Sequence, residues 1–289
     1  MDHLVTPQEQ GWRLRDVLRR SMGVSYSAMK SAKWDQRILV DGAPRTVDTI
    51  LSAGQVVTML FPEEKPVYQL APHSIPLTIP YQDEHFLVID KPAPLASQSS
   101  AGHPDNSLEN ALFAHFGCPE DFIYRPVNRL DKGTSGLMVV ALDPHSQHRL
   151  QSLLHTADFQ RLYLAVVEVA PPEPSGIIDA PIAKVDAASI RRIVTPEGKP
   201  SVTHYEVLER SGSRSLVRLR LDTGRTHQIR VHMAHLGCPV AGDFLYGTEL
   251  PSLPGRFALH SAELILTHPF TGERLHLTSP LPDGLRALL

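Results

Sequence analysis

Residues 125–142 read Arg-Pro-Val-Asn-Arg-Leu-Asp-Lys-Gly-Thr-Ser-Gly-Leu-Met-Val-Val-Ala-Leu. One carboxylate, Asp131, lies between a short segment, residues 126–130, and a Gly-Thr-Ser-Gly turn that leads into an apolar strand, residues 137–142. An Asp in a turn usually caps its own backbone. An acid fixed at a tight turn on a sheet edge, however, is held by the scaffold and stays open to a ligand. The stretch therefore makes Asp131 the first candidate for a catalytic residue.

The composition is that of a globular chain without disulfides. The 289 residues are 42% apolar and 20% charged, enough for one large domain or a large and a small one. Cys118 and Cys238 are far apart and form no Cys-x-x-Cys pair, which excludes a disulfide framework. The closest histidines, His227, His232 and His235, lack zinc-site spacing, so we expect no metal and interpret them as solvated or facing a nucleic acid.

Targeting and cofactor signals are missing from the sequence. The N-terminus has no basic segment followed by an apolar one, as a secretory signal would. The strongest apolar run, residues 137–142, is too short to cross a bilayer. There is no P-loop and no Gly-x-Gly-x-x-Gly motif. We therefore expect a cytoplasmic protein with no membrane partner and no organic cofactor.

Positive charge is concentrated in two segments, although the net charge is −3. Residues 13–45 hold eight Lys/Arg against three Asp/Glu, and residues 210–232 hold six Arg against one Asp. Basic patches on an acidic body can direct a polyanion to chosen surfaces. Ordinary solvated faces can have the same composition, so charge alone favours neither interpretation.

The first 62 residues predict a separate small unit. A helix is expected over residues 14–22, with apolar positions on one side and arginines on the other. Ser25 is a suitable N-cap for a second helix through Trp34. Residues 38–42 and 53–59 each predict a short strand beside a turn.

Residues 12–61 resemble the small RNA-binding domain named after ribosomal protein S-four, in which an Arg-rich helical face meets RNA. The resemblance implies a small α/β RNA-binding domain over residues 1–62. The residues it assigns to RNA binding are Arg15, Arg19, Lys30 and Lys33. A small helical cap packed on the main domain is the alternative.

A proline-rich segment separates this unit from the rest. Four prolines occur in residues 62–76, which predicts a stiff linker over residues 63–76. Strands are expected over 86–89 and, with clean alternation, over 215–221. Helices are expected over 108–116, 145–154 and 226–236. Strands mixed with helices, without regular βαβ units, favour an α+β domain with a mainly antiparallel sheet over residues 77–289.

Segments in order along residues 77–280 resemble the motifs of the RluA-type RNA pseudouridine synthases. Residues 79–92 match a strand that leads to Lys-Pro, and residues 128–131 match the His-Arg-Leu-Asp motif. Residues 160–165 match Lys-x-Tyr-x-Ala, and residues 198–203 match Gly-Lys-x-Ala-x-Thr. Residues 223–237 match the longest signature, which is followed by Gly-Asp-x-x-Tyr-Gly at 242–247. The resemblance implies the pseudouridine synthase fold, with a mixed, mainly antiparallel sheet. It also implies an isomerase that acts on ribosomal or transfer RNA without a cofactor, with a monomer as the default.

The resemblance assigns catalysis to Asp131, Tyr163 and Arg230. A carboxylate can serve as nucleophile or as acid and base in glycosyl chemistry. The ring of Tyr163 would stack on an extruded uracil. Arg230 would keep Asp131 ionised and orient it through a bidentate pair. The alternatives are that Tyr163 is a half-buried packing residue and that Arg230 is a surface RNA contact.

Further residues are assigned to substrate binding. Arg129 would help to extrude the base, and Arg225, expected at the start of a helix, would hold a backbone phosphate. The remaining expected RNA contacts are His227, Gln228, Leu259 and His260.

Departures from the family pattern concern the choice of RNA. Asn stands at 128 where His is common, Lys-Gly at 132–133 replaces a commoner Arg-Asp pair, and Cys stands at 238 where His is frequent. Two rival interpretations remain: a non-catalytic RNA-binding or ribosome-assembly protein, and a nucleoside hydrolase. The motif lacks the second carboxylate of the usual hydrolase scheme.

Overall fold

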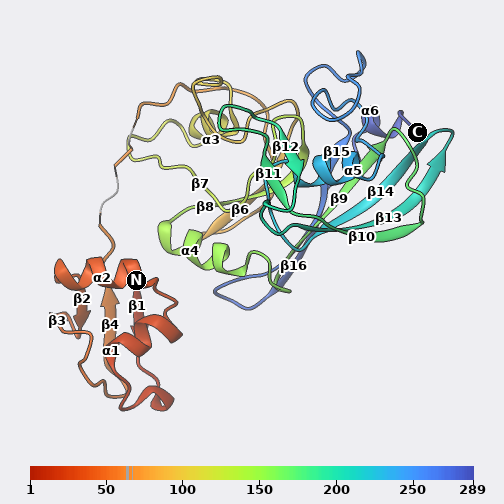
Figure 1. The fold of residues 1–289 in the computed structure, drawn as a ribbon. Coiled ribbons are helices and arrows are strands. Elements are labelled where there is room, and N and C mark those ends of the chain that lie inside the picture. The colour runs from red at the N-terminus through yellow and green to blue at the C-terminus, as the bar shows by residue number, and fades with distance from the viewer. Residues whose placement is uncertain (63–64, 67) are drawn as a thin grey trace. The chain divides into compact units, whose positions relative to one another are not determined.

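The computed structural model describes residues 1–62, 65–66 and 68–289 and divides into two compact units, Met1–Val67 and Tyr68–Leu289 (Figure 1). Residues 63, 64 and 67 of the expected linker lie outside the described residues. Later in that segment, Tyr68 donates its hydroxyl hydrogen to Glu109, at 2.6 Å. The Asn110 side-chain amide also donates to the carbonyl of Ala71, at 2.8 Å. This part of the expected linker therefore packs on the larger unit.

The smaller unit is a four-stranded antiparallel sheet in the order β1-β4-β2-β3, accompanied by short helices. Its elements are β1 Asp2–Leu4, a 3-10 turn Pro7–Glu9, α1 Leu14–Asp16, a π-helical segment Val17–Ser21, α2 Tyr26–Trp34, β2 Ile38–Val40, β3 Ala43–Pro44 and β4 Val56–Met59. The hydroxyl of Ser25 accepts from the backbone N–H of Ala28, as expected for an N-cap. Arg15, Arg19, Lys30 and Lys33 are all exposed.

A buried carboxylate ties the start of this unit to its helices. Glu9 is 6% exposed and accepts hydrogen bonds from the hydroxyl of Ser21 and the backbone N–H of Thr6. Burial alone would raise the pKa of Glu9, but these hydrogen bonds and those from His3 and the Thr6 hydroxyl outweigh it and lower the pKa to about 2. The ionised form of Glu9 is therefore part of the folded smaller unit.

The larger unit is built on one mixed sheet in the order β10-β13-β14-β9-β15-β8-β6-β5, with β16 on β15 and β7 on β8. Only the β8–β15 pair is parallel among the pairings of the described strands. The expected α+β fold with a mainly antiparallel mixed sheet is therefore confirmed. The strands are β5 Thr78–Gln82, β6 Phe86–Lys91, β7 Arg125–Pro126, β8 Ser135–Ala141, β9 Phe159–Val167, β10 Ser175–Asp179, β13 Val202–Ser211, β14 Arg214–Leu221, β15 Leu259–Thr267 and β16 Arg274–Thr278, with a separate hairpin of β11 Ile182–Lys184 and β12 Arg192–Val194.

Helices cover both faces of the sheet. They are α3 Leu108–His115, α4 Pro144–Leu153, α5 Gln228–His235 and the short α6 Asp283–Arg286. Residues of α3 and α5 share one hydrophobic core with Leu87 and Ile89, whereas α4 contributes to a second core with Phe86 and Val88. Alternate residues of β6 thus face opposite cores, which explains why its first four residues, 86–89, are all apolar. None of the described helices is long and apolar enough to cross a bilayer.

The position of β8 corrects one expectation. β8 lies between β6 and β15, so Asp131 precedes an interior strand and does not lie on a sheet edge. β15 passes very close to β8 at Gly136, whose φ is +105°. A Cβ at Gly136 would lie 2.3 Å from the carbonyl oxygen of Ser261. Only glycine therefore fits where the chain enters the strand behind Asp131.

Candidate active site

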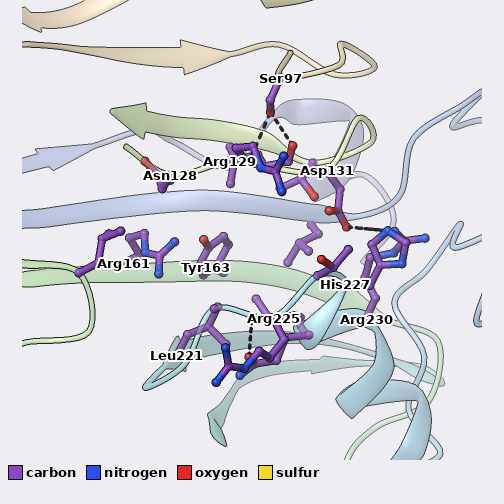
Figure 2. A pocket seen from close by; sticks show the side chains of 18 of the residues that line it. Ser97, Asn128, Arg129, Asp131, Arg161, Tyr163, Leu221, Arg225, His227 and Arg230 are labelled. Carbon is purple, nitrogen blue, oxygen red and sulfur yellow. Dashed lines mark hydrogen bonds and ion pairs between the residues drawn. The ribbon is translucent and has the colours of Figure 1, made fainter. Parts of the chain in front are cut away.

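A cavity of about 400 Å³ brings together motifs that are far apart in the sequence (Figure 2). The loop before β8, the middle of β9 and the segment that leads into α5 form its walls. The lining residues include Ser97, Asn128, Arg129, Asp131, His155, Arg161, Tyr163, Arg225, His227, Gln228, Arg230 and Leu259. Most of the residues singled out from the sequence thus share one cavity.

The loop that carries Asp131 is held on both sides of the carboxylate. The hydroxyl of Ser97 donates to the carbonyl of Leu130 and accepts from its backbone N–H. On the other side, the carbonyl of Lys132 accepts from the backbone N–H of Leu95, at 3.0 Å. The Asp131 backbone is therefore fixed, while its side chain, 26% exposed, remains open to the cavity.

A buried lysine lies beneath this loop. Lys91, fully buried at the end of β6, donates from Nζ to the carbonyls of Leu95, at 2.8 Å, and Pro92, at 3.0 Å. Burial lowers the pKa of Lys91 to about 7, although the charge of Asp131 opposes the shift. The lysine of the Lys-Pro motif thus packs against the loop that carries Asp131.

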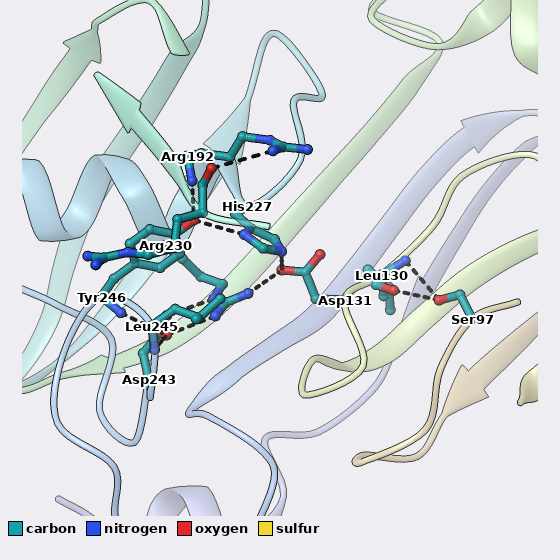
Figure 3. Close-up of polar contacts among 10 residues, drawn as sticks. Ser97, Leu130, Asp131, Arg192, His227, Arg230, Asp243, Leu245 and Tyr246 are labelled. Atoms are coloured by element: carbon teal, nitrogen blue, oxygen red, sulfur yellow. Dashed lines mark hydrogen bonds and ion pairs between the residues drawn. The ribbon is translucent and has the colours of Figure 1, made fainter. Parts of the chain in front are cut away.

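A buried arginine joins two carboxylates (Figure 3). Arg230, on α5, donates from Nη1 to Oδ2 of Asp131, at 3.0 Å. Its Nε and Nη2 donate to the two oxygens of Asp243, at 2.6 and 2.8 Å. The contact between Arg230 and Asp131 was expected, but the bidentate partner is Asp243. Asp243 therefore fixes the guanidinium, which presents a single N–H to Asp131.

Desolvation makes this pairing strong. Arg230 is 3% exposed, Asp243 is fully buried, and the guanidinium carbon lies 4.0 Å from the ring centre of Phe257. Burial alone would lower the pKa of Arg230, but hydrogen bonding and charge attraction to Asp243, with a contribution from Asp131, raise it. Arg230 is thus a permanent positive charge beside the Asp131 carboxylate.

A second chain of polar contacts, two hydrogen bonds and one ion-pair contact, reaches Asp131 from the β11–β12 hairpin (Figure 3). The hydroxyl of Tyr246 accepts from the backbone N–H of Arg192, at 2.8 Å, and contacts Nδ1 of His227, at 2.9 Å. A Tyr246 hydroxyl that donates to Nδ1 leaves the proton of a neutral ring on Nε2. That nitrogen lies 3.9 Å from Oδ2 of Asp131. Burial lowers the pKa of His227, which favours the neutral ring.

Comparisons with known proteins show the family of this chain. The sequence profile of the RNA pseudouridylate synthases matches residues 85–235. Ribosomal large subunit pseudouridine synthase D of Pseudomonas aeruginosa is 39% identical, with 98% of this chain and 93% of that protein covered. The chain belongs to the RNA pseudouridylate synthase family. It is therefore an RNA pseudouridine synthase, an isomerase.

Further relatives extend the likeness over nearly the whole chain. An uncharacterized RNA pseudouridine synthase of Bacillus subtilis is 37% identical, with 93% of this chain and 95% of that protein covered. Among solved structures, human RNA pseudouridylate synthase domain containing 1 is similar with a TM-score of 0.59 and 28% identity. That match covers 73% of this chain and 86% of the human one.

Two residues that were expected to bind RNA form hydrogen bonds within the protein. Gln228 is 2% exposed and accepts from Thr223 and from the backbone N–H of Arg225, while its amide donates to the carbonyl of Val202. It therefore shapes the turn before α5. Arg225 precedes α5 by three residues, so it does not start the helix, and its Nε donates to the carbonyl of Pro200, at 3.2 Å.

Two histidines also differ from expectation. His260 does not line the cavity: it is 1% exposed and lies between the hydroxyl of Ser135, at 2.9 Å, and the carbonyl of Ser279, at 3.1 Å. Its neighbour Leu259 does line it. His232 is fully buried and bonded to Thr203, so it is a core residue and is not solvated.

The sequence reasoning missed four contributors. Asp243 and Tyr246 were quoted within a family motif but given no role, and Ser97 and Arg161 were not considered as site residues. Arg161 lies two positions before Tyr163 on β9, so alternation alone places both on one face of the sheet. Within the described residues, no three His, Cys, Asp or Glu side chains gather as metal ligands.

Proposed function

We propose that this enzyme isomerises a uridine of large-subunit ribosomal RNA, with Asp131 as the catalytic carboxylate. The support for the substrate is the name of the Pseudomonas aeruginosa relative, which is similar over 98% of this chain. The support for Asp131 is its position in a cavity of about 400 Å³, fixed by its loop and 3.0 Å from Arg230.

The reaction breaks the bond between ribose C1′ and N1 of uracil, turns the base, and joins C1′ to C5. The hydrogen of C5 leaves as a proton and N1, released from the sugar, takes up a proton, so the atoms of the nucleotide are conserved. Asp131 can add to the sugar, add to the ring, or remove a proton from the sugar. Each route needs the ionised carboxylate, which Arg230 stabilises.

Other residues in the cavity have proposed roles in holding the base. Tyr163 is 4% exposed and lines the cavity, where its ring can stack on uracil. Arg129, exposed at the cavity, would occupy the position that the extruded base leaves. Arg225 would bind a backbone phosphate, and Leu259 would pack against the base. His227 would contact the bound nucleotide.

The smaller unit would contribute a second RNA contact. Arg15, Arg19, Lys30 and Lys33 are exposed on its helices, which suits binding to backbone phosphates. We propose that it acts as an S-four-like RNA-binding domain. The complete enzyme would be a cytoplasmic monomer without a metal or organic cofactor.

The test uses purified protein with two transcripts, large-subunit ribosomal RNA and a pool of transfer RNAs, each tritiated at C5 of uridine. Tritium release from the ribosomal transcript by wild type, and none by Asp131→Asn, is the expected result. Release from the transfer RNAs alone would overturn the proposed substrate. Equal release by Asp131→Asn would overturn the role of Asp131.

A further inference from the structure

Three basic side chains of the cavity lie near one another. His155 follows α4, Arg161 lies on β9, and Arg225 precedes α5, and all three line the cavity. Figure 2 shows Arg161 and Tyr163 on the same strand, with Tyr163 between Arg161 and Asp131. Arg161 therefore lies beyond the place proposed for the uracil ring.

A glycine brings the three together. A Cβ on Gly224 would lie 3.0 Å from Cε1 of His155 and 3.7 Å from Nη2 of Arg161. Gly224 directly precedes Arg225, so the backbone at this point runs against both side chains. Even the smallest side chain would crowd this position, and glycine leaves room for the side chains of His155 and Arg161.

The charge of this cluster is not neutralised inside the protein. Across the described residues, neither Arg161 nor Arg225 forms a salt bridge with a carboxylate. The carboxylate nearby in the sequence, Asp222, is already paired with Arg220, at 2.6 Å, and His204, at 2.7 Å. Burial, followed by the charges of Arg161 and Arg225, lowers the pKa of His155. Like charges gathered without a counter-ion are the arrangement of a site that receives an anion.

We propose that His155, Arg161 and Arg225 form a clamp for the RNA backbone phosphate next to the target uridine. This rests on the proposed function, because a uridine between Tyr163 and Asp131 carries its phosphate on the sugar. Guanidinium groups match the oxygens of a phosphate. One N–H of His155 bonds the backbone of Asp222, and a bound anion would favour the protonated ring, whose second N–H can donate to it. The clamp would anchor the extruded nucleotide by its backbone, whatever the neighbouring bases are.

The first experiment combines protein variants with a modified RNA. Each phosphate flanking the target uridine of the ribosomal substrate is replaced in turn by an uncharged methylphosphonate. With wild type, one replacement should raise KM about tenfold and leave kcat within threefold. With Arg161→Ala, KM should already be about tenfold higher, and that replacement should add nothing. Additive effects at every flanking phosphate would overturn the clamp.

Salt dependence supplies an independent readout. The slope of log Kd against log salt should become shallower by about 0.7 for Arg161→Ala, as expected for one lost phosphate contact to single-stranded RNA. Arg161→Lys should restore most of the slope. Arg274→Ala is the matched control, since Arg274 is exposed on β16 and does not line this cavity. A slope for Arg161→Ala equal to that of Arg274→Ala would contradict the clamp.

A last measurement needs no known RNA target. The imidazole resonance of His155 is followed by NMR while uridine 5′-monophosphate, uridine 3′-monophosphate or uridine is added. One of the monophosphates should shift the resonance, uridine should not, and Gly224→Ala should abolish the shift. No response to either monophosphate would overturn the clamp. Failure of wild type to modify any RNA would instead overturn the proposed substrate and leave this test of the clamp in place.

Discussion

The Asp243→Asn substitution probes how Arg230 is held beside Asp131. Asp243 is fully buried, and both its oxygens accept from Arg230. Asn can keep its oxygen at the Oδ1 position, where it still accepts from Nη2 and from the backbone N–H of Leu245. Its amide nitrogen then faces Nε of Arg230, so a charge-assisted hydrogen bond is replaced by two opposed donors.

The expected magnitude follows from this geometry. Losing one hydrogen bond to a charged group costs about 1.5–3 kcal/mol, and removing one partner of a buried ion pair about 3–5 kcal/mol. Because Asp131 still compensates part of the charge of Arg230, we expect a loss of about 3 kcal/mol in the free energy of unfolding. A guanidinium displaced by about 1 Å from Asp131 should lower kcat about 100-fold.

Two spectroscopic signals report the unfolding of the two units separately. Both tryptophans of the chain, Trp12 and Trp34, lie in the smaller unit, so their fluorescence should report an unchanged urea transition. Far-ultraviolet circular dichroism should show an earlier transition of the larger unit. Asp222→Asn is the control, because that carboxylate is 42% exposed and should cost under about 1 kcal/mol. A loss below 1 kcal/mol with unchanged kcat for Asp243→Asn would refute the reasoning.

Three further substitutions test other parts of the structure. Tyr246→Phe removes the hydroxyl that orients His227. Loss of this hydrogen bond, about 1–1.5 kcal/mol, should lower kcat roughly tenfold in single-turnover tritium release. An unchanged kcat would show that the contact between Tyr246 and His227 does not assist catalysis. Gly136→Ala should prevent β8 and β15 from pairing, so the larger unit should lose its cooperative unfolding transition in circular dichroism. A normal transition would contradict the close approach of the two strands. Because the pKa of Glu9 is lowered to about 2, its ionised form stabilises the smaller unit above about pH 4.5, and this contribution is lost as the pH falls towards 2. Glu9→Gln should therefore lower the urea midpoint reported by tryptophan fluorescence at pH 7, whereas near pH 2 it should match wild type; a difference that persists there would contradict the assignment.

Local patterns predicted the elements of the fold well. Residues 215–221, in which apolar and polar side chains alternate, lie in β14 as predicted. Ser25 is the N-cap of α2, as its residue type suggested. Such features depend on neighbours within a few residues. The interior position of β8 could not be predicted in this way, because strand order depends on which distant strands pair. An apolar run buried on both faces was the available signal for an interior strand.

Only the residues to which the family resemblance assigns a role were predicted for the candidate site. The contact of Arg230 with Asp131 was expected from the resemblance, and the two residues, 99 positions apart, are joined in the structure. The choice of Asp243 as bidentate partner depends on how the chain after α5 folds back, which no local pattern encodes. Leu259 and His260 were both expected in the site, but alternation along β15 turns the two side chains to opposite faces, and only Leu259 lines the cavity.

The most direct test of the central claim compares cellular RNA from a strain lacking this protein with RNA from strains complemented by wild type or by Asp131→Asn. Pseudouridines are mapped by carbodiimide labelling and primer extension, and expression of both proteins is checked. The account predicts one position in large-subunit ribosomal RNA that wild type restores and Asp131→Asn does not. Restoration of that position by Asp131→Asn would contradict it.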